Sequence, residues 1–117
     1  MAKPTRITRD MIDTYVKSGL WDDRSVAETL KQNVERYPDK EALVDSKRRL
    51  TWRDLDRITD NVAGELIRRG IQRDQAIVVQ LPLTGDSLIL LLACHKAGNP
   101  CCFAPLTFRQ NEMKHVI

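Results

Sequence analysis

Residues 51–82 read TWRDLDRITDNVAGELIRRGIQRDQAIVVQLP, and this stretch decides the fold class. Its first part predicts a helix, because one apolar stripe recurs at helical spacing through Leu55, Ile58, Val62, Leu66 and Ile67. Thr51 followed by Asp54 predicts the capped start of this helix, and Gly70 predicts its left-handed stop. Residues 76–82 are short, apolar and rich in β-branched side chains without alternation, which is typical of a strand covered on both faces.

The sequence on the carboxyl side continues the alternation of helix and strand. We expect a helix over 86–97 that ends at Gly98, a strand over 101–104 and a last helix over 109–117. Strands that alternate with helices predict right-handed βαβ units and a parallel sheet, which is an α/β fold.

The amino-terminal side predicts two helices and a hairpin. Apolar spacing indicates a helix over 8–18, and a Ser-x-x-Glu pattern starts a second helix over 25–37. Residues 41–45 and 49–51 form short strands around a polar turn, so we expect them to pair as a hairpin. Residues 1–7 are polar and uncapped, and we expect them to be loose.

Composition limits the class of protein. The 117 residues fit one domain, and 42% apolar with 30% charged residues allow a core and solubility. The longest apolar run, Leu88–Cys94, is far shorter than the roughly 20 residues of a membrane span. A net charge of +3 does not favour a nucleic-acid partner. Three cysteines behind a polar start favour reduced thiols and a cytoplasmic protein.

Candidate reactive groups are few. Cys101 and Cys102 are adjacent, so on a strand they point to opposite faces, and no zinc-binding spacing accompanies Cys94, His95 or His115. We therefore expect packing roles for the cysteines, no metal site, and a surface position for His95. Phosphate-loop and nucleophile-elbow patterns are absent from the sequence.

Several polar features admit a structural and a functional interpretation. The turn 84–87 precedes a helix and could hold an anion, but we favour Asp86 and Ser87 as ordinary caps. We expect the basic run 47–49 to be a solvated turn and the acids of helix 52–69 to share a mixed-charge solvent face. Trp21 and Trp52 are expected to be buried or half-buried anchors.

Three blocks carry a resemblance to a family. Residues 50–55, Leu-Thr-Trp-Arg-Asp-Leu, resemble the first conserved block of the AMP-forming acyl-CoA synthetase superfamily, with Trp and Asp where the family usually has Tyr and Glu. Residues 94–98 with 103–105 resemble its second block, Leu-Lys-Ala-Gly followed by Pro. Residues 80–82 are similar to the Leu-Pro-Asn that ends a core strand, with Leu in place of Asn.

Other segments narrow the resemblance. Residues 7–12, 19–21, 91–94 and 108–113 are similar to ligases for cyclohexanecarboxylate and related acids, and siderophore-type aryl-acid AMP ligases share the same front. The resemblance spans nearly the whole chain. It implies that residues 1–117 are an N-terminal fragment of an AMP-binding (adenylation) domain, hence an incomplete part of a larger α/β domain.

The resemblance also implies an activity for the parent protein. Such ligases use ATP and Mg to convert a carboxylic acid to an acyl-adenylate, release pyrophosphate, and transfer the acyl group to the thiol of CoA. Their phosphate loop, adenine and ribose sites and catalytic lysine follow these opening blocks. We therefore expect no catalytic residue here, no cofactor bound to this piece alone, and an inactive fragment of a fatty-acid-type or related acyl-CoA ligase.

One loop is a weaker candidate site. In some family members the loop after the second block lies near CoA, which implies a CoA-adjacent position for Leu106, Thr107, Phe108 and Arg109. A helix start and an arginine suit a phosphate. The alternative is that this loop merely begins the last helix.

The last expected helix has no stop signal, so we expect the chain to be the front piece of a longer protein. In such a front piece, the sheet edges and apolar faces would be uncovered, so we expect the isolated chain to be marginally stable or to associate with itself. The alternative from another class is a non-enzymatic interaction module that reuses the scaffold, and a third is small-ligand binding at the turn 84–87.

Overall fold

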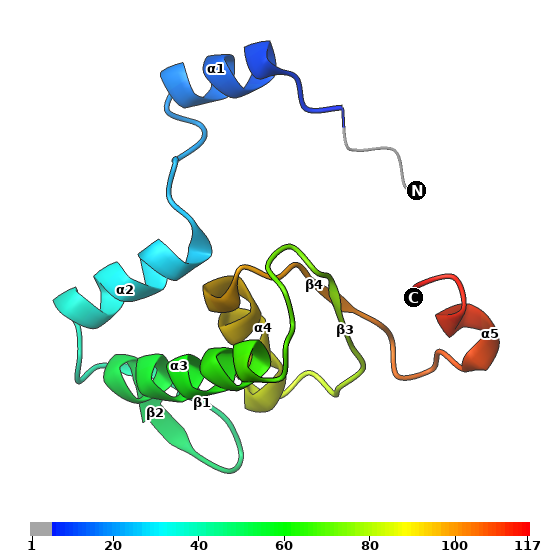
Figure 1. Cartoon of the computed structure of the whole chain (residues 1–117). Coiled ribbons are helices and arrows are strands. Elements are labelled where there is room, and N and C mark those ends of the chain that lie inside the picture. The colour runs from blue at the N-terminus through cyan, green and yellow to red at the C-terminus, as the bar shows by residue number, and fades with distance from the viewer. Residues whose placement is uncertain (1–5) are drawn as a thin grey trace.

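The computed structural model describes residues 6–117, so most of the segment expected to be loose lies outside the described residues. Its elements in chain order are α1 (Arg9–Lys17), α2 (Val26–Arg36), β1 (Glu41–Val44), β2 (Arg49–Thr51), α3 (Trp52–Arg68), β3 (Ile77–Val79), α4 (Gly85–Ala97), β4 (Cys101–Phe103) and α5 (Gln110–Met113) (Figure 1). None of the described helices is long and apolar enough to cross a bilayer.

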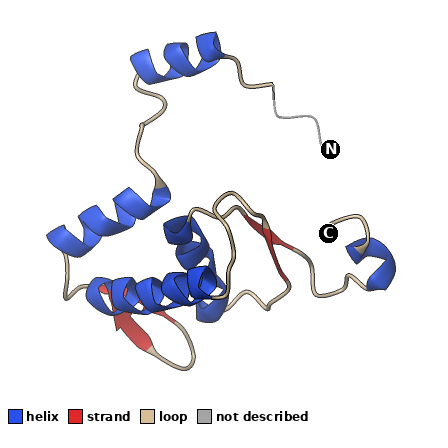
Figure 2. Cartoon of the chain, in the orientation of Figure 1, coloured by secondary structure: helices blue, strands red, loops and turns tan. Residues whose placement is uncertain are grey.

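The strands form two separate pairs (Figure 2). β1 and β2 are the predicted antiparallel hairpin, with Val44 opposite Arg49. β3 and β4 are parallel, with Ile77 opposite Cys101 and Val79 opposite Phe103, and α4 connects them. The predicted α/β class and the parallel pairing are therefore confirmed.

The core lies where α2, α3 and α4 meet the hairpin. Leu30, Leu55 and Ile89 supply one buried side chain from each helix, and the half-buried Trp52 packs against them. Figure 1 shows α3 lying beside α4, with the hairpin next to α3. Thr59 is also buried, and its hydroxyl donates 2.8 Å to the Leu55 carbonyl, so it leaves no unpaired polar group in the interface.

Local capping signals gave correct helix starts. The Ser25 hydroxyl accepts the amide of Glu28, and the Glu28 carboxylate accepts the amide of Ser25 at 2.6 Å. Thr51 and Asp54 make the same reciprocal pair at the start of α3. Gly98 ends α4 with a positive φ of 79°, a conformation that glycine adopts without strain.

The last helix is shorter than predicted. α5 covers Gln110–Met113 instead of 109–117, because the amides of His115 and Val116 bond to the third residue back, as Val116 does to Met113 at 3.0 Å. Ile117 is 88% exposed while Met113 and Val116 are half-buried, so the described chain gives the expected apolar face only partial packing. A helix this short is not stable without such packing.

Two burial expectations are also corrected. Trp21 is 41% exposed and lies against Tyr15 with 4.9 Å between ring centroids, so it is not an anchor of the core. In β3 only Val79 is buried, while Ile77 and Val78 are half-buried, because the described sheet has only two strands and is not covered on both faces.

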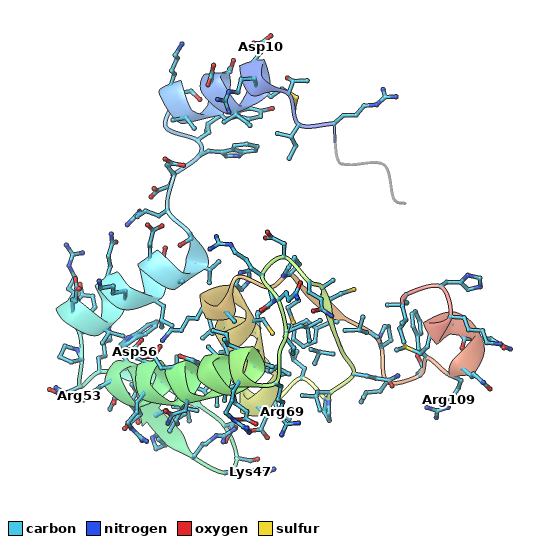
Figure 3. The ribbon with its side chains drawn as sticks, in the orientation of Figure 1. Asp10, Lys47, Arg53, Asp56, Arg69 and Arg109 are labelled. Atoms are coloured by element: carbon cyan, nitrogen blue, oxygen red, sulfur yellow. The ribbon has the colours of Figure 1, made fainter. Side chains whose placement is uncertain are left out.

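A lysine joins α3 to α4. The side chain of Lys96 is only 13% exposed, and its ammonium lies 2.5 Å from Asp56 Oδ1 and 2.7 Å from Asp60 Oδ1. It also donates to the Asp56 carbonyl at 3.1 Å. Asp56, labelled in Figure 3, is thus half-buried and paired, which corrects the expectation that the acids of this helix share a solvent face.

The hairpin turn is held against the start of α4. Asp45 accepts the amides of Lys47 at 2.8 Å and Arg48 at 2.9 Å, and its carboxylate lies against Gly85, the first residue of α4. A Cβ at Gly85 would collide with Oδ2 of Asp45 and lie 3.0 Å from Cδ2 of Leu43. Glycine is therefore required here by close approach.

This close approach predicts opposite outcomes for the same substitution in two helices. Gly85→Ala should lower the free energy of unfolding by about 1–3 kcal/mol, because the new methyl group forces the hairpin away from α4. Gly64→Ala in α3, where nothing lies within 4 Å of the new carbon, should raise it by about 0.5–1 kcal/mol. Urea denaturation followed by circular dichroism measures both, and equal effects would contradict the packing described.

Candidate functional site

The parallel strands place two chain segments at one edge. β3 and β4 run in the same direction, so the residues after β3 and those after β4 lie together at the carboxyl edge of the pair. They enclose a cleft of about 410 Å³. We call it the carboxyl-edge cleft; it is lined by Leu81, Pro82, Leu83, Ser87, Phe103, Ala104, Pro105 and Leu106. Ligands of α/β proteins commonly bind at this edge.

The cleft presents a carbon surface. Leu83 is 98% exposed, and Leu106 and Phe103 are also exposed beside it. The polar side chain in the lining, Ser87, is already paired: its hydroxyl donates 2.7 Å to the Thr84 carbonyl and accepts the Thr84 amide at 3.1 Å. An apolar arm of a ligand therefore suits the cleft better than a phosphate or a metal ion does.

The side chain of Gln80 holds the loop after β4, which forms one wall of the cleft. Its side-chain amide donates to the Pro105 carbonyl at 2.8 Å and to the Phe108 carbonyl at 3.0 Å. The Ala104 amide adds a bond of 2.9 Å to the Val79 carbonyl, which extends the parallel pairing by one step. The loop after β4 is thus held against the end of β3. No local sequence pattern predicts this contact, because 25 residues separate Gln80 from Pro105.

The four residues expected near CoA are divided by the structure. Leu106 lines the cleft, while Thr107, Phe108 and Arg109 follow it towards α5. The guanidinium of Arg109, labelled in Figure 3, donates to the Leu106 carbonyl at 3.1 Å and stays exposed. Its backbone amide donates to Glu112 at 2.9 Å, and this bond holds the pKa of the Glu112 carboxyl below its usual value. The CoA-adjacent role of the loop stays a prediction.

The turn 84–87 is filled by the protein's own groups. The pKa of the Asp45 carboxyl is held below its usual value by hydrogen bonds from the backbone amides of Lys47, Arg48 and Gly85 and by the charge of the Arg48 guanidinium. Partial burial of the carboxyl acts in the opposite direction. Asp45 thus stands where an anion would bind at the start of α4.

Two expectations about these turns change. Thr84 is the N-cap residue of α4, and its amide donates to the Ser87 hydroxyl, whereas Asp86 pairs with the Arg48 guanidinium. Arg48 is half-buried between Asp45 and Asp86, so the basic run at the hairpin turn is not simply solvated. Its central arginine joins the hairpin to α4.

The cysteines occupy three different environments. Cys94 is buried, Cys101 half-buried and Cys102 exposed. Burial raises the pKa of the Cys94 thiol to about 11, so this thiol stays protonated and unreactive at neutral pH. His95 is exposed, as predicted. Within residues 6–117, His, Cys, Asp and Glu side chains form no group of three that is placed to hold a metal ion.

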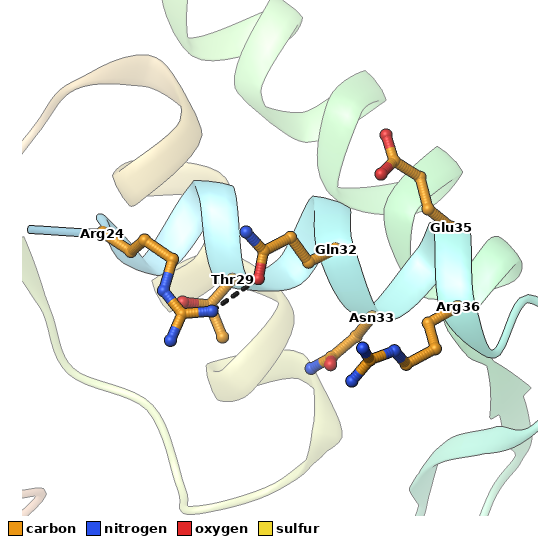
Figure 4. A pocket seen from close by; sticks show the side chains of 6 residues that line it. All are labelled: Arg24, Thr29, Gln32, Asn33, Glu35 and Arg36. Atoms are coloured by element: carbon orange, nitrogen blue, oxygen red, sulfur yellow. Dashed lines mark hydrogen bonds between the residues drawn. The ribbon is translucent and has the colours of Figure 1, made fainter. Parts of the chain in front are cut away.

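A larger hollow of about 510 Å³ lies along α2 (Figure 4). Its lining residues are Arg24, Thr29, Gln32, Asn33, Glu35 and Arg36, and the Arg24 guanidinium donates to Gln32 at 2.6 Å. All six belong to one helix and the turn before it, so no second element brings polar groups towards a ligand. The carboxyl-edge cleft is the stronger candidate.

Comparison with known proteins adds a family. The family described as AMP-binding enzyme matches residues 30–117. A salicylyl-CoA synthase / salicylate adenylyltransferase of Streptomyces is 32% identical over 108 residues, covering 92% of this chain and 20% of that protein. A medium-chain fatty-acid–CoA ligase of Escherichia coli is 34% identical over 85 residues, covering 72% and 15%.

A solved structure agrees over nearly the whole chain. The apo structure of Mycobacterium smegmatis MbtA matches with a TM-score of 0.90 and 27% identity, covering 96% of this chain and 21% of that one. The chain thus spans about one fifth of the length of the relatives that it matches.

The two hydrogen bonds that Gln80 donates to the loop after β4 predict a local loss of protection when this residue is replaced. Gln80→Leu keeps the side-chain size but removes both donated bonds, each of which contributes about 1 kcal/mol. Amides of residues 106–113 should then exchange with deuterium roughly tenfold faster or more, while those of α3 stay protected. Gln72→Leu, at an exposed glutamine, is the matched control. Unchanged exchange in Gln80→Leu would show that the loop is held by other contacts.

Proposed function

The chain belongs to the AMP-binding enzyme family, and on this premise we propose that it is the N-terminal scaffold of an ATP-dependent carboxylate–CoA ligase. The proposed parent enzyme converts a carboxylate and ATP to an acyl-adenylate and pyrophosphate, then transfers the acyl group to the CoA thiol. The observation that carries the proposal is the family match over residues 30–117. Three of the relatives are named as CoA-forming enzymes, and they support the thioester step.

The role proposed for this segment is to hold the strands in register. Thr51 and Asp54 fix the start of α3, and Lys96 fixes α4 against it. Gly98 then ends α4, so that β4 lies parallel to β3 and the carboxyl-edge cleft forms between the segments that follow them. The first and second blocks of the family resemblance, residues 50–55 and 94–98 with 103–105, thus have structural roles in this proposal.

The described residues do not fit ATP and Mg. The start of α4 is filled by Asp45, and no metal-binding group of side chains lies within residues 6–117. Both would be bound by other parts of the parent enzyme, so we derive no step of adenylation from this segment.

The carboxyl-edge cleft does fit part of CoA, which supplies the thiol nucleophile of the second step. Its carbon lining suits the pantetheine arm, with Leu106 in the wall. Thr107, Phe108 and Arg109 continue from that wall, and an exposed guanidinium suits a phosphate of the same cofactor. This assignment is part of the proposal.

For the acid, we propose a ring carboxylate of the cyclohexanecarboxylate or aryl type. The salicylate-specific relative matches over 92% of the chain, whereas the fatty-acid ligase matches over 72%. The family assignment does not favour the alternative of a non-enzymatic module. The cytoplasm is the proposed compartment.

The proposal predicts an inactive segment and an active parent. Incubated with ATP, Mg and cyclohexanecarboxylate, salicylate or octanoate, the 117-residue chain should release no pyrophosphate above the blank. Its sequence contains no phosphate-loop pattern, and Asp45 lies against the start of α4, so the charge developing on the phosphates would not be stabilised there.

The matched sample is the longer polypeptide that is encoded when the reading frame is followed past Ile117. It should release pyrophosphate, and at least tenfold faster with one of the two ring acids than with octanoate. Release by the 117-residue chain alone would contradict the scaffold role. A stop codon at that point, or a longer polypeptide inactive with every acid, would contradict the ligase.

A further inference from the structure

Helix α1 carries an apolar face that the described chain leaves open. Met11, Ile12, Tyr15, Val16, Leu20 and Trp21 gather on this side and in the turn that follows; we call them the α1 face. No residue of α1 is buried, and Leu20 is 71% exposed. Figure 1 shows α1 apart from the body formed by α2, α3 and α4.

Contacts within the described chain shape the α1 face. After α1 the chain turns back at Gly19, and the amides of Leu20 and Trp21 both donate to the Tyr15 carbonyl, at 2.9 and 3.1 Å. This turn places the Trp21 ring 4.9 Å from the Tyr15 ring. Large aromatic and aliphatic side chains fixed on an exposed surface are typical of an interface.

The match to a longer solved protein extends into α1. The match to MbtA leaves 4% of this chain uncovered, which is about 5 of 117 residues, so the nine-residue α1 cannot lie outside it. At least part of α1 therefore has a counterpart in that longer chain. A helix this short needs packing to hold a position. The other 79% of that chain (100 − 21) is the polypeptide able to provide it.

The charges on α1 argue against a lipid surface. Arg9 and Lys17 are balanced by Asp10 and Asp13 on the same helix. Helices that bind anionic membranes carry an excess of basic residues on the polar face. An apolar protein surface is the better complement.

We propose that the α1 face is a docking surface for the part of the adenylation domain that lies outside residues 1–117, an inference that rests on the proposed function. By this contact α1 fastens the front of the chain to the larger remainder of the domain. Residues such as Trp21 become buried only when that remainder is present.

Hydrogen–deuterium exchange of residues 9–21 tests the docking. One sample is the 117-residue chain, and a second is a chimera in which it replaces the matched fifth of MbtA. A third is a smaller graft of residues 7–21 onto MbtA, which retains the host's own body. We expect exchange at least 100-fold slower in both hybrids than in the chain alone, with residues 52–68 as the reference for folding.

Two neighbouring substitutions in the graft give the matched control. Val16→Asp, on the α1 face, should abolish the protection of residues 9–21. Lys17→Asp, on the polar face of the same turn, should leave it, although both add an acid at the same end of the helix.

Three results would overturn the proposal. The first is exchange of residues 9–21 that is as fast in the graft as in the chain alone, and the second is an equal effect of the two substitutions. The third is protection in the chain alone that rises with protein concentration, because a second copy of the chain would then be the partner. A chimera that protects α1 but releases no pyrophosphate with any acid would count against the proposed ligase and leave the docking inference standing.

Discussion

The carboxylate of Asp45 holds the hairpin turn against the amino end of α4, the helix that connects the two parallel strands. It accepts two amides of its own turn and lies so close to Gly85 that a side chain there has no room. The amino end of a helix that follows a parallel strand is where many α/β proteins bind phosphate. Here an internal carboxylate satisfies that end of the helix, so this segment acts as a frame for chemistry located elsewhere.

The frame leaves two open surfaces with different characters. At the carboxyl edge, β3 and β4 position an apolar cleft whose one polar side chain, Ser87, is already paired. At the front, the α1 face presents exposed aromatic and aliphatic side chains on a helix that lies apart from the body. Both surfaces suit further polypeptide or an apolar ligand arm, and neither suits a bare nucleotide phosphate. This division is consistent with a chain that spans about one fifth of its relatives.

Local rules predicted the elements, while contacts between distant residues escaped them. Ser25 and Thr51 were identified as caps because their partners lie three residues away. The pairing of Lys96 with Asp56 spans 40 residues, and nothing in either helix alone indicates it. The same limit made the last helix too long in the prediction, because apolar periodicity around Ile117 does not show whether anything covers it. In the candidate site, family resemblance predicts a role for Leu106, and that role stays a prediction. The hydrogen bonds of Gln80 to the loop after β4 are visible only in three dimensions.

The most direct test of the frame is the backbone amide resonance of Gly85 during titration with ATP and Mg at millimolar concentration. With Asp45 in place, the ¹H and ¹⁵N shifts of Gly85 should show no saturable change. A saturable shift of Gly85 and its neighbours in α4 would show that this helix end accepts a nucleotide phosphate. The chain would then be a nucleotide-binding unit in its own right.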